Sequence, residues 1–216
     1  MKQKSETFSN FKEFKALAEN QSDQNIKVLR SDCGGGYDSK AFHDYCKQHG
    51  IRRQFTTRYT MQQNGVAKRK NMAIMNMVRS MLKGSNLSNE YWAEAVACAI
   101  YVINKSPTKS VMKKVPKQAW LGIYCNVSHL RVFGCVAYAH VPKDRRGKLD
   151  DKSEKCIFTG YSEQSKAYEL YNPVTKKTKI NRDVLFKEQE PWNGSIDKTI
   201  DVRVSMLEEE DVAEKE

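Results

Sequence analysis

The sequence predicts an α+β protein, with helices in its first half and β-strands in most of its second half. Up to about residue 122, apolar residues recur every three or four positions, as on one face of a helix. After that residue they recur at every second position, which is typical of strands. Two short β-rich segments, 26–31 and 51–57, interrupt the helical part.

The first strand candidates flank a helix. Ser39 is placed to cap this helix and Gly50 to end it, while Gly36 closes a glycine run that lets the chain turn tightly. Segment 5–20 carries apolar side chains at helical spacing, which predicts an amphipathic helix before the first strand: Phe8, Phe11, Phe14, Leu17 and Ala18.

Two longer helices are expected next. Residues 65–83 carry an apolar stripe that points to the core: Ile74, Met77, Val78, Met81 and Leu82. Ser88 is placed to cap the following helix, which Pro107 ends. The buried face of that helix is expected to hold six residues: Trp92, Ala95, Val96, Ala99, Val102 and Ile103. A basic loop, 108–115, then leads to a short helical turn that Pro116 opens.

The β-rich part has four candidate strands, at 130–140, 155–161, 167–171 and 177–186. About 60 residues of this kind fit a small β-barrel or a strongly bent sheet. From Lys187 onward charge rises and apolar periodicity ends, so we expect a flexible acidic tail.

The composition disfavours several classes of protein. No segment approaches the roughly 18 apolar residues of a membrane span, and the N-terminal residues lack the apolar stretch of a secretory leader. The cysteines are scattered, without a CxxC pair, so we expect reduced thiols in a nuclear or cytoplasmic protein and no zinc site: Cys33, Cys46, Cys98, Cys125, Cys135 and Cys156.

Positive charge is concentrated in the folded part of the chain. The formal net charge is +11 for 216 residues, but residues 1–186 hold 33 bases and 16 acids. Between Arg52 and Lys117 there are 13 bases against Glu90 and Glu94. Such a patch suggests a polyanionic partner, of which nucleic acid is the usual one, and charge alone leaves a merely solvated basic face equally open.

Five segments give this pattern a family context. They read RSDCGGGY at 30–37, YTMQQNGVAKRKN at 59–71, EYWAEAV at 90–96, NKSPTK at 104–109 and HLRVFGCVAY at 129–138. In this order they resemble the integrase of Ty/copia-type retrotransposons, which is part of the Pol polyprotein. The resemblance covers about residues 1–188.

The resemblance implies a fold and three domain boundaries. Residues 1–122 would be the C-terminal part of an RNase H-like catalytic core, truncated and mostly helical. Residues 123–188 would form a small SH3-like β-barrel, and 189–216 the acidic tail. The family's chemistry is DNA integration, in which two Asp and one Glu hold two Mg²⁺ or Mn²⁺ ions for phosphoryl transfer.

Carried over residue by residue, the family's carboxylates are largely missing. Asp32 matches the second Asp, and Lys68 stands at the position of the Glu. By resemblance the first Asp would lie upstream of Met1. A lone carboxylate beside an ammonium is a poor site for two divalent ions, so we expect no productively bound metal and no catalysis.

Nucleic-acid binding tolerates such losses better, because each cation near a phosphate contributes separately. We expect non-specific DNA contact from nine residues: Arg52, Arg53, Arg58, Gln62, Gln63, Asn64, Lys68, Arg69 and Lys70. Strands missing upstream would leave an apolar face exposed, which predicts self-association. Two alternatives remain open: a protein-interaction module without a DNA role, and an expressed retroelement relic without a selected function.

Overall fold

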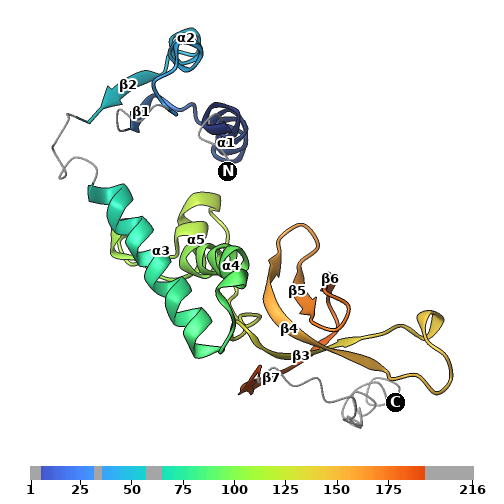
Figure 1. Ribbon diagram of the computed structural model, residues 1–216. Coiled ribbons are helices and arrows are strands. Elements are labelled where there is room, and N and C mark those ends of the chain that lie inside the picture. Colours follow the sequence, from blue (N-terminus) through green and yellow to red (C-terminus); the bar gives the residue numbers. More distant parts are fainter. Residues whose placement is uncertain (1–5, 32–35, 57–64, 193–216) are drawn as a thin grey trace, which may run out of the picture. The chain divides into compact units, whose positions relative to one another are not determined.

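The computed structural model describes residues 6–31, 36–56 and 65–192, and Figure 1 shows the order of its elements. Packing divides the chain into two compact units. The first takes in residues up to 77 together with 99–129, and the second takes in 78–98 together with the residues from 130 on. The predicted boundaries near residues 122 and 188 stay a prediction. None of the described helices is long and apolar enough to cross a membrane.

The first unit begins with a helix and a parallel strand pair that encloses a second helix. The elements are α1 (Thr7–Ser22), β1 (Val28–Ser31), α2 (Lys40–Gln48) and β2 (Arg52–Phe55). Strands β1 and β2 pair in parallel, with Leu29 opposite Arg53. The core between them is built from Phe11, Phe42, Cys46 and Ile51. On α1, by contrast, Phe14 is 60% exposed and Leu17 is 58% exposed.

The remaining helices follow in the predicted order: α3 (Gly65–Gly84), α4 (Trp92–Lys105) and α5 (Pro116–Leu121), with single 3₁₀ turns η2 (Asn89–Tyr91) and η3 (Lys109–Val111) between them. The predicted stripe of α3 is confirmed, since its five members are buried or half-buried. The expected burial of Trp92 is wrong, because 58% of this residue is exposed. Trp92 begins α4, and helical side chains lean toward the N-terminus, so no preceding turn of its own helix covers it.

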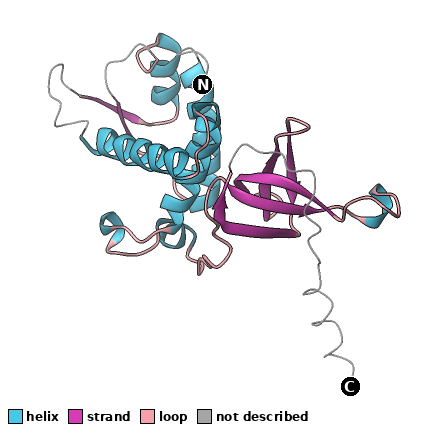
Figure 2. Ribbon diagram, turned by 60° about the horizontal axis from the view of Figure 1, so that its bottom comes forward, coloured by secondary structure: helices cyan, strands magenta, loops and turns pink. Residues whose placement is uncertain are grey.

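The second unit contains a five-stranded antiparallel sheet, drawn in magenta in Figure 2. Its strands are β3 (Cys135–His140), β4 (Ser153–Ser162), β5 (Ala167–Asn172), β6 (Lys177–Asn181) and β7 (Val184–Pro191), with a short 3₁₀ turn, η4 (Lys143–Arg145), between β3 and β4. They pair in the order β6-β5-β4-β3-β7. The α+β class is confirmed. Of the two forms expected for the β-rich part, a small barrel or a strongly bent sheet, the structure shows a sheet that does not close into a barrel, because the described ladders leave β6 and β7 as separate edges.

The link between β6 and β7 shows that the sheet is strongly curled. Only Arg182 and Asp183 join two strands that lie at opposite edges, so these edges approach each other at that end. The Asn181 side chain accepts a hydrogen bond from the Asp183 backbone N at 3.0 Å and donates to the His140 carbonyl at 2.9 Å. The predicted single strand 177–186 is therefore two strands, divided by an asparagine turn.

The core of the sheet is formed by alternating residues on one face. Six buried side chains make it up: Cys135, Ala137, Ala139, Cys156, Phe158 and Leu170. Phe158 packs edge-to-face against the rings of Tyr161, Tyr168 and Phe186. Such aromatic contacts each add about 0.5–1.5 kcal/mol beyond the burial of apolar area.

Candidate nucleic-acid interface

The helix α2 between the two parallel strands gives the interface its fixed framework. The Ser39 side chain accepts a hydrogen bond from the Phe42 backbone N at 3.2 Å, so Ser39 caps α2 as predicted. Phe42 is fully buried and stacks on Phe11, with ring centres 5.0 Å apart. The Ile51 backbone N donates to the Cys46 carbonyl at 2.8 Å and leads the chain directly into β2.

Arg53 on β2 is packed against aromatic rings. Its guanidinium lies 4.8 Å from the ring centre of Phe42 and 4.4 Å from that of Phe55. Its Nη2 donates to the Tyr37 carbonyl at 2.6 Å, while Nε and Nη1 are buried without an acceptor in the described part of the chain. Burial raises the pKa of the Cys46 thiol, and the charge of Arg53 opposes that rise. Arg53 therefore has a packing role, and its contact with nucleic acid stays a prediction.

The opposite face of the strand pair is polar and basic. Arg52 alternates with Arg53 along β2 and is exposed. On β1 beside it, Arg30 donates to Gln54 Oε1 from Nη2 at 3.0 Å, so this side chain is held against the sheet. Arg52 and Arg30 thus present two guanidinium groups on a surface that is open to solvent.

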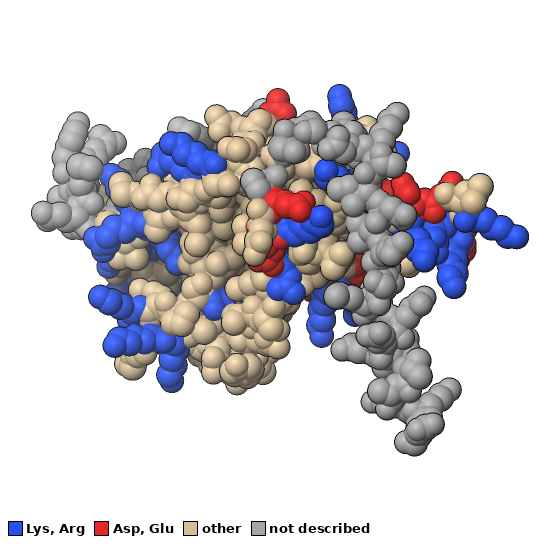
Figure 3. Space-filling model, turned by 90° about the horizontal axis from the view of Figure 1, so that it is seen from below, with Lys and Arg blue, Asp and Glu red and all other residues tan. Residues whose placement is uncertain are grey.

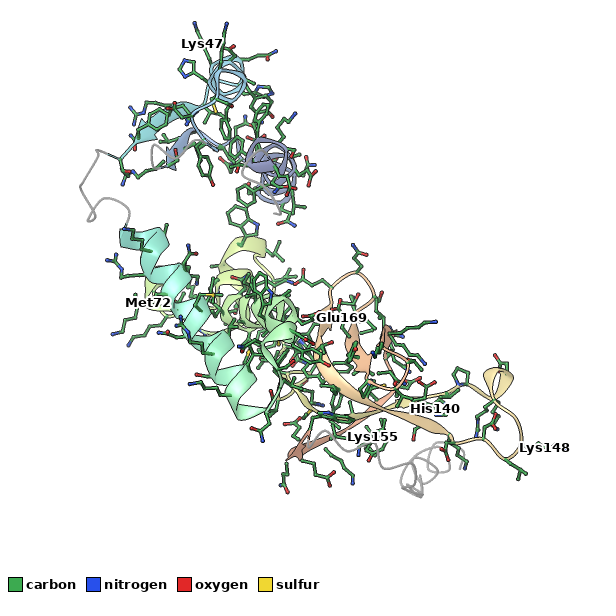
Figure 4. The ribbon with its side chains drawn as sticks, viewed as in Figure 1. Lys47, Met72, His140, Lys148, Lys155 and Glu169 are labelled. Atoms are coloured by element: carbon green, nitrogen blue, oxygen red, sulfur yellow. The ribbon has the colours of Figure 1, made fainter. Side chains whose placement is uncertain are left out.

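The first turns of α3 carry three consecutive exposed bases, Lys68, Arg69 and Lys70. Arg69 folds back over the start of its own helix, because a Cβ placed on Gly65 would lie 3.0 Å from its Nη1. The amide groups at a helix N-terminus carry partial positive charge, so these cations add to a field that already favours anions. On the face that Figure 3 draws, Lys and Arg side chains (blue) outnumber Asp and Glu (red). Figure 4 labels Met72, which lies on α3 and is exposed.

Of the nine predicted contact residues, the structure therefore places five: Arg52 and Arg53 on β2, and Lys68, Arg69 and Lys70 on α3. The other four lie outside the described residues, namely Arg58, Gln62, Gln63 and Asn64. Asp32, the expected surviving carboxylate, also lies outside them.

Sequence reasoning missed a polar cleft in the second unit. The cleft has a volume of about 190 Å³ and is lined by Glu90, Tyr91, Glu94, Thr159, Tyr171 and Thr178. Glu169, labelled on β5 in Figure 4, lies near Glu94. Burial raises the pKa of Glu169, and the negative charge of Glu94 raises it further. No sequence signal brings these residues together, because they come from η2, from α4 and from three strands.

Comparison with known proteins decides the family. Over 190 residues, or 88% of this chain, the sequence is 47% identical to the retrovirus-related Pol polyprotein from transposon TNT 1-94 of Nicotiana tabacum. Over 188 residues it is 36% identical to the corresponding polyprotein from transposon RE1 of Arabidopsis thaliana. The chain belongs to the retrovirus-related Pol polyproteins of transposons. It spans 14% and 13% of the length of these two Pol relatives.

Three further matches were found for this Pol chain. Residues 135–200 match the retroviral polymerase SH3-like domain. A cryo-EM structure of the simian T-cell lymphotropic virus intasome with the PP2A regulatory subunit B56 gamma aligns with a TM-score of 0.44 at 16% identity, covering 87% of this chain and 65% of that chain. The HTLV-2 integrase catalytic core domain in complex with magnesium aligns with a TM-score of 0.39 at 18% identity, over 53% of this chain and 69% of that chain.

The divalent metal that the integrase resemblance implies needs a cluster of carboxylates. Within residues 6–31, 36–56 and 65–192, no three His, Cys, Asp or Glu side chains lie close enough to hold an ion. Lys68, which the resemblance places at the position of the Glu, is an exposed cation on α3. The described residues of the Pol chain therefore do not fit such an ion.

Proposed function

We propose that this Pol-related chain binds nucleic acid through its phosphate backbone and does not catalyse DNA integration. The single observation that carries the proposal is the run of exposed cations on the first turns of α3, from Lys68 to Lys70, at the position where the resemblance places a metal-binding Glu. The same substitution that removes a metal ligand adds a contact for a phosphate.

Electrostatics supports binding without sequence preference. Lys68 and Lys70 have no acidic partner within the described part of the chain, so their ammonium groups are available to a polyanion. Each phosphate that a cation neutralises releases condensed counterions, which gives an affinity that falls steeply with salt. We propose duplex DNA as the ligand and the nucleus or cytoplasm as the place of action.

A salt titration of duplex DNA binding tests the proposal. Fluorescence anisotropy of the full chain with a labelled duplex should give a linear fall of log affinity with log salt. The triple variant Lys68→Ala, Arg69→Ala, Lys70→Ala should lower that slope by about 2–3, since each lost phosphate contact removes about 0.9. Absence of binding at low salt would refute the proposal.

A charge-matched variant provides the control. Lys148, Lys152 and Lys177 are exposed and lie in the second unit, and Figure 4 labels Lys148 in the connection between β3 and β4. Replacing these three lysines by alanine removes the same net charge as the triple variant on α3. Equal losses in both variants would mean that total charge, and not the α3 surface, determines binding.

Self-association is a second part of the proposal. Phe14 and Leu17 lie one turn apart on α1 and are exposed, as are Val28 and Phe55 on the strand pair. Exposed apolar side chains of this kind favour contact between copies of the chain. Sedimentation of wild type and of a Phe14→Ser, Leu17→Ser variant measures this, and an unchanged monomer fraction would exclude this surface.

A further inference from the structure

Lys105, the last residue of α4, is a buried cation without a carboxylate beside it. Only 9% of the residue is exposed. Its Nζ donates to the Sγ of Cys125 at 3.8 Å and lies 4.7 Å from the ring centre of Tyr101. Within the described residues no acidic side chain pairs with it. Burying an ammonium without an anion is costly, so the helix C-terminus, the aromatic ring and the sulfur must together compensate.

Cys125 differs from the other described cysteines. Cys46, Cys98, Cys135 and Cys156 are buried. Burial raises the pKa of Cys98 and of Cys135 to about 12 and that of Cys156 to about 11, which keeps these thiols protonated and unreactive. Cys125 is only half-buried. Among the described cysteines it is therefore the thiol that a small oxidant can reach.

The neighbourhood of the pair is cationic and aromatic. Lys117 Nζ lies 5.9 Å from the same Tyr101 ring, and the Tyr101 hydroxyl hydrogen-bonds to His129 Nε2 at 2.8 Å. Tyr124, next to Cys125 in the chain, is exposed. The sulfur thus lies beside an exposed residue on one side and a buried amine on the other.

We propose that Cys125 is a peroxide-sensitive thiol and that Lys105 traps its oxidised form as a covalent, reversible nitrogen–sulfur link. The buried Lys105 supplies the nitrogen for this link, because its Nζ lies 3.8 Å from the Cys125 sulfur. This assignment is independent of nucleic-acid binding.

The chemistry has two balanced steps. Hydrogen peroxide first oxidises the Cys125 thiol to a sulfenic acid: the O–O bond breaks, an S–O bond forms, and water leaves. The Lys105 ammonium then loses one proton to water, and the resulting amine attacks the sulfur: the N–S bond forms as the S–O bond breaks, and the hydroxyl leaves as water with a second proton from the amine. Sulfenic acids are known to condense with nitrogen in this way. The flexible stem of lysine lets the two atoms approach to bonding distance.

The link would change this part of the fold in two ways. It would tie the end of α4 to the segment that follows α5, and it would remove the positive charge of Lys105. A thiol reductant would reverse both changes.

Mass spectrometry of the peroxide-treated full chain tests the proposal. Proteolysis should yield the Lys105 and Cys125 peptides joined, with a mass lower by two hydrogen atoms than the sum of the free peptides. The joined pair should increase with peroxide concentration and disappear after treatment with dithiothreitol.

Three variants make the test specific. Lys105→Arg keeps the charge but replaces the amine, and Cys125→Ser removes the sulfur; both should lose the joined pair completely. Lys117→Arg, which changes the other lysine at the Tyr101 ring, should form it at the wild-type level. Oxidation of Cys125 to sulfinic acid without a joined peptide, or a link to Lys117, would overturn the proposal. Far-UV circular dichroism of each variant confirms that it is folded.

Discussion

Gly134 and Ser85 lie so close together that a Cβ built on the glycine would stand 2.3 Å from the Cβ of Ser85. The glycine also has a φ of +78° and donates its backbone N to the Phe158 carbonyl at 2.9 Å. Both residues belong to the second unit, so this contact fixes the chain just before β3 against the end of α3.

The Gly134→Ala variant should lose about 2–5 kcal/mol of unfolding free energy, because overpacking and a left-handed backbone conformation are both unfavourable for alanine. Urea unfolding followed by tryptophan fluorescence measures the loss. Gly160→Ala is the control in the same unit, since its Cβ would meet only Glu169 Oε2 at 3.5 Å. A Gly134→Ala variant as stable as Gly160→Ala would contradict the described packing.

A gain in stability is expected at the tip of the basic loop that follows α4. Met112 is 89% exposed and has a φ of +54°, and Lys113 follows with a φ of +63°. Met112→Gly should raise the unfolding free energy by about 0.5–1 kcal/mol, because glycine adopts this conformation without steric cost. Ile123→Gly, at an exposed position without positive φ, should lower stability instead. Thermal unfolding of both variants distinguishes the two effects.

The polar cleft should make stability depend on pH. The pKa of Glu169 is raised in the folded state, so its ionisation destabilises the fold as pH rises above the ordinary value of about 4.5. Glu94→Gln removes the repulsion and should stabilise the chain at pH 7, with the benefit disappearing at acidic pH where Glu169 is protonated. Urea unfolding at a series of pH values measures this. Asp151→Asn, an exposed control, should show no such dependence, and a pH-independent gain in Glu94→Gln would contradict the assignment.

Placing a glutamate at position 68, as the resemblance suggests for the family, should weaken DNA binding without creating catalysis. Lys68→Glu should lower the salt slope by about 1, since one phosphate contact is lost. A single added carboxylate does not make a site for two ions, so neither the variant nor wild type should process or join DNA ends with Mg²⁺ or Mn²⁺. Gel assays with labelled duplex ends measure this, with Lys177→Glu as the charge control. Processing or joining of DNA ends by the wild type or by Lys68→Glu would refute the proposed loss of catalysis.

Several local signals in the sequence predicted local structure, although Ser88 makes no side-chain capping hydrogen bond to the helical turn that follows it. Ser39 caps α2, and the stripe of α3 faces the core, because capping and helical periodicity depend on residues within one or two turns. Burial on individual faces was harder to predict. Phe14 and Trp92 lie at helical positions that periodicity assigns to a core, yet whether a core covers them depends on neighbouring elements that the pattern does not contain.

The strand order of the sheet and the lining of the cleft were also hard to predict, because both depend on contacts between residues that are distant in sequence. The 177–186 segment reads as one strand, and only the short Asn181–Asp183 turn sends its two halves to opposite edges. The cleft combines Glu94 with Thr159 and Tyr171, which are distant in sequence and meet only in the folded unit. The five described residues of the expected interface were selected from charge and from the family resemblance. Neither of these predicts that Arg53 packs against aromatic rings.

The strand order has a consequence for the way the chain folds during synthesis. Strand β3 pairs with β4 on one edge and with β7 on the other. The second of these pairings, for example that of Ala139 with Val184, forms only after β7 has been synthesised. While the intervening residues are still inside the ribosome, β3 offers an open edge to any other extended chain nearby. A pause in translation before residue 184 would prolong that vulnerable period and increase aggregation of the nascent protein.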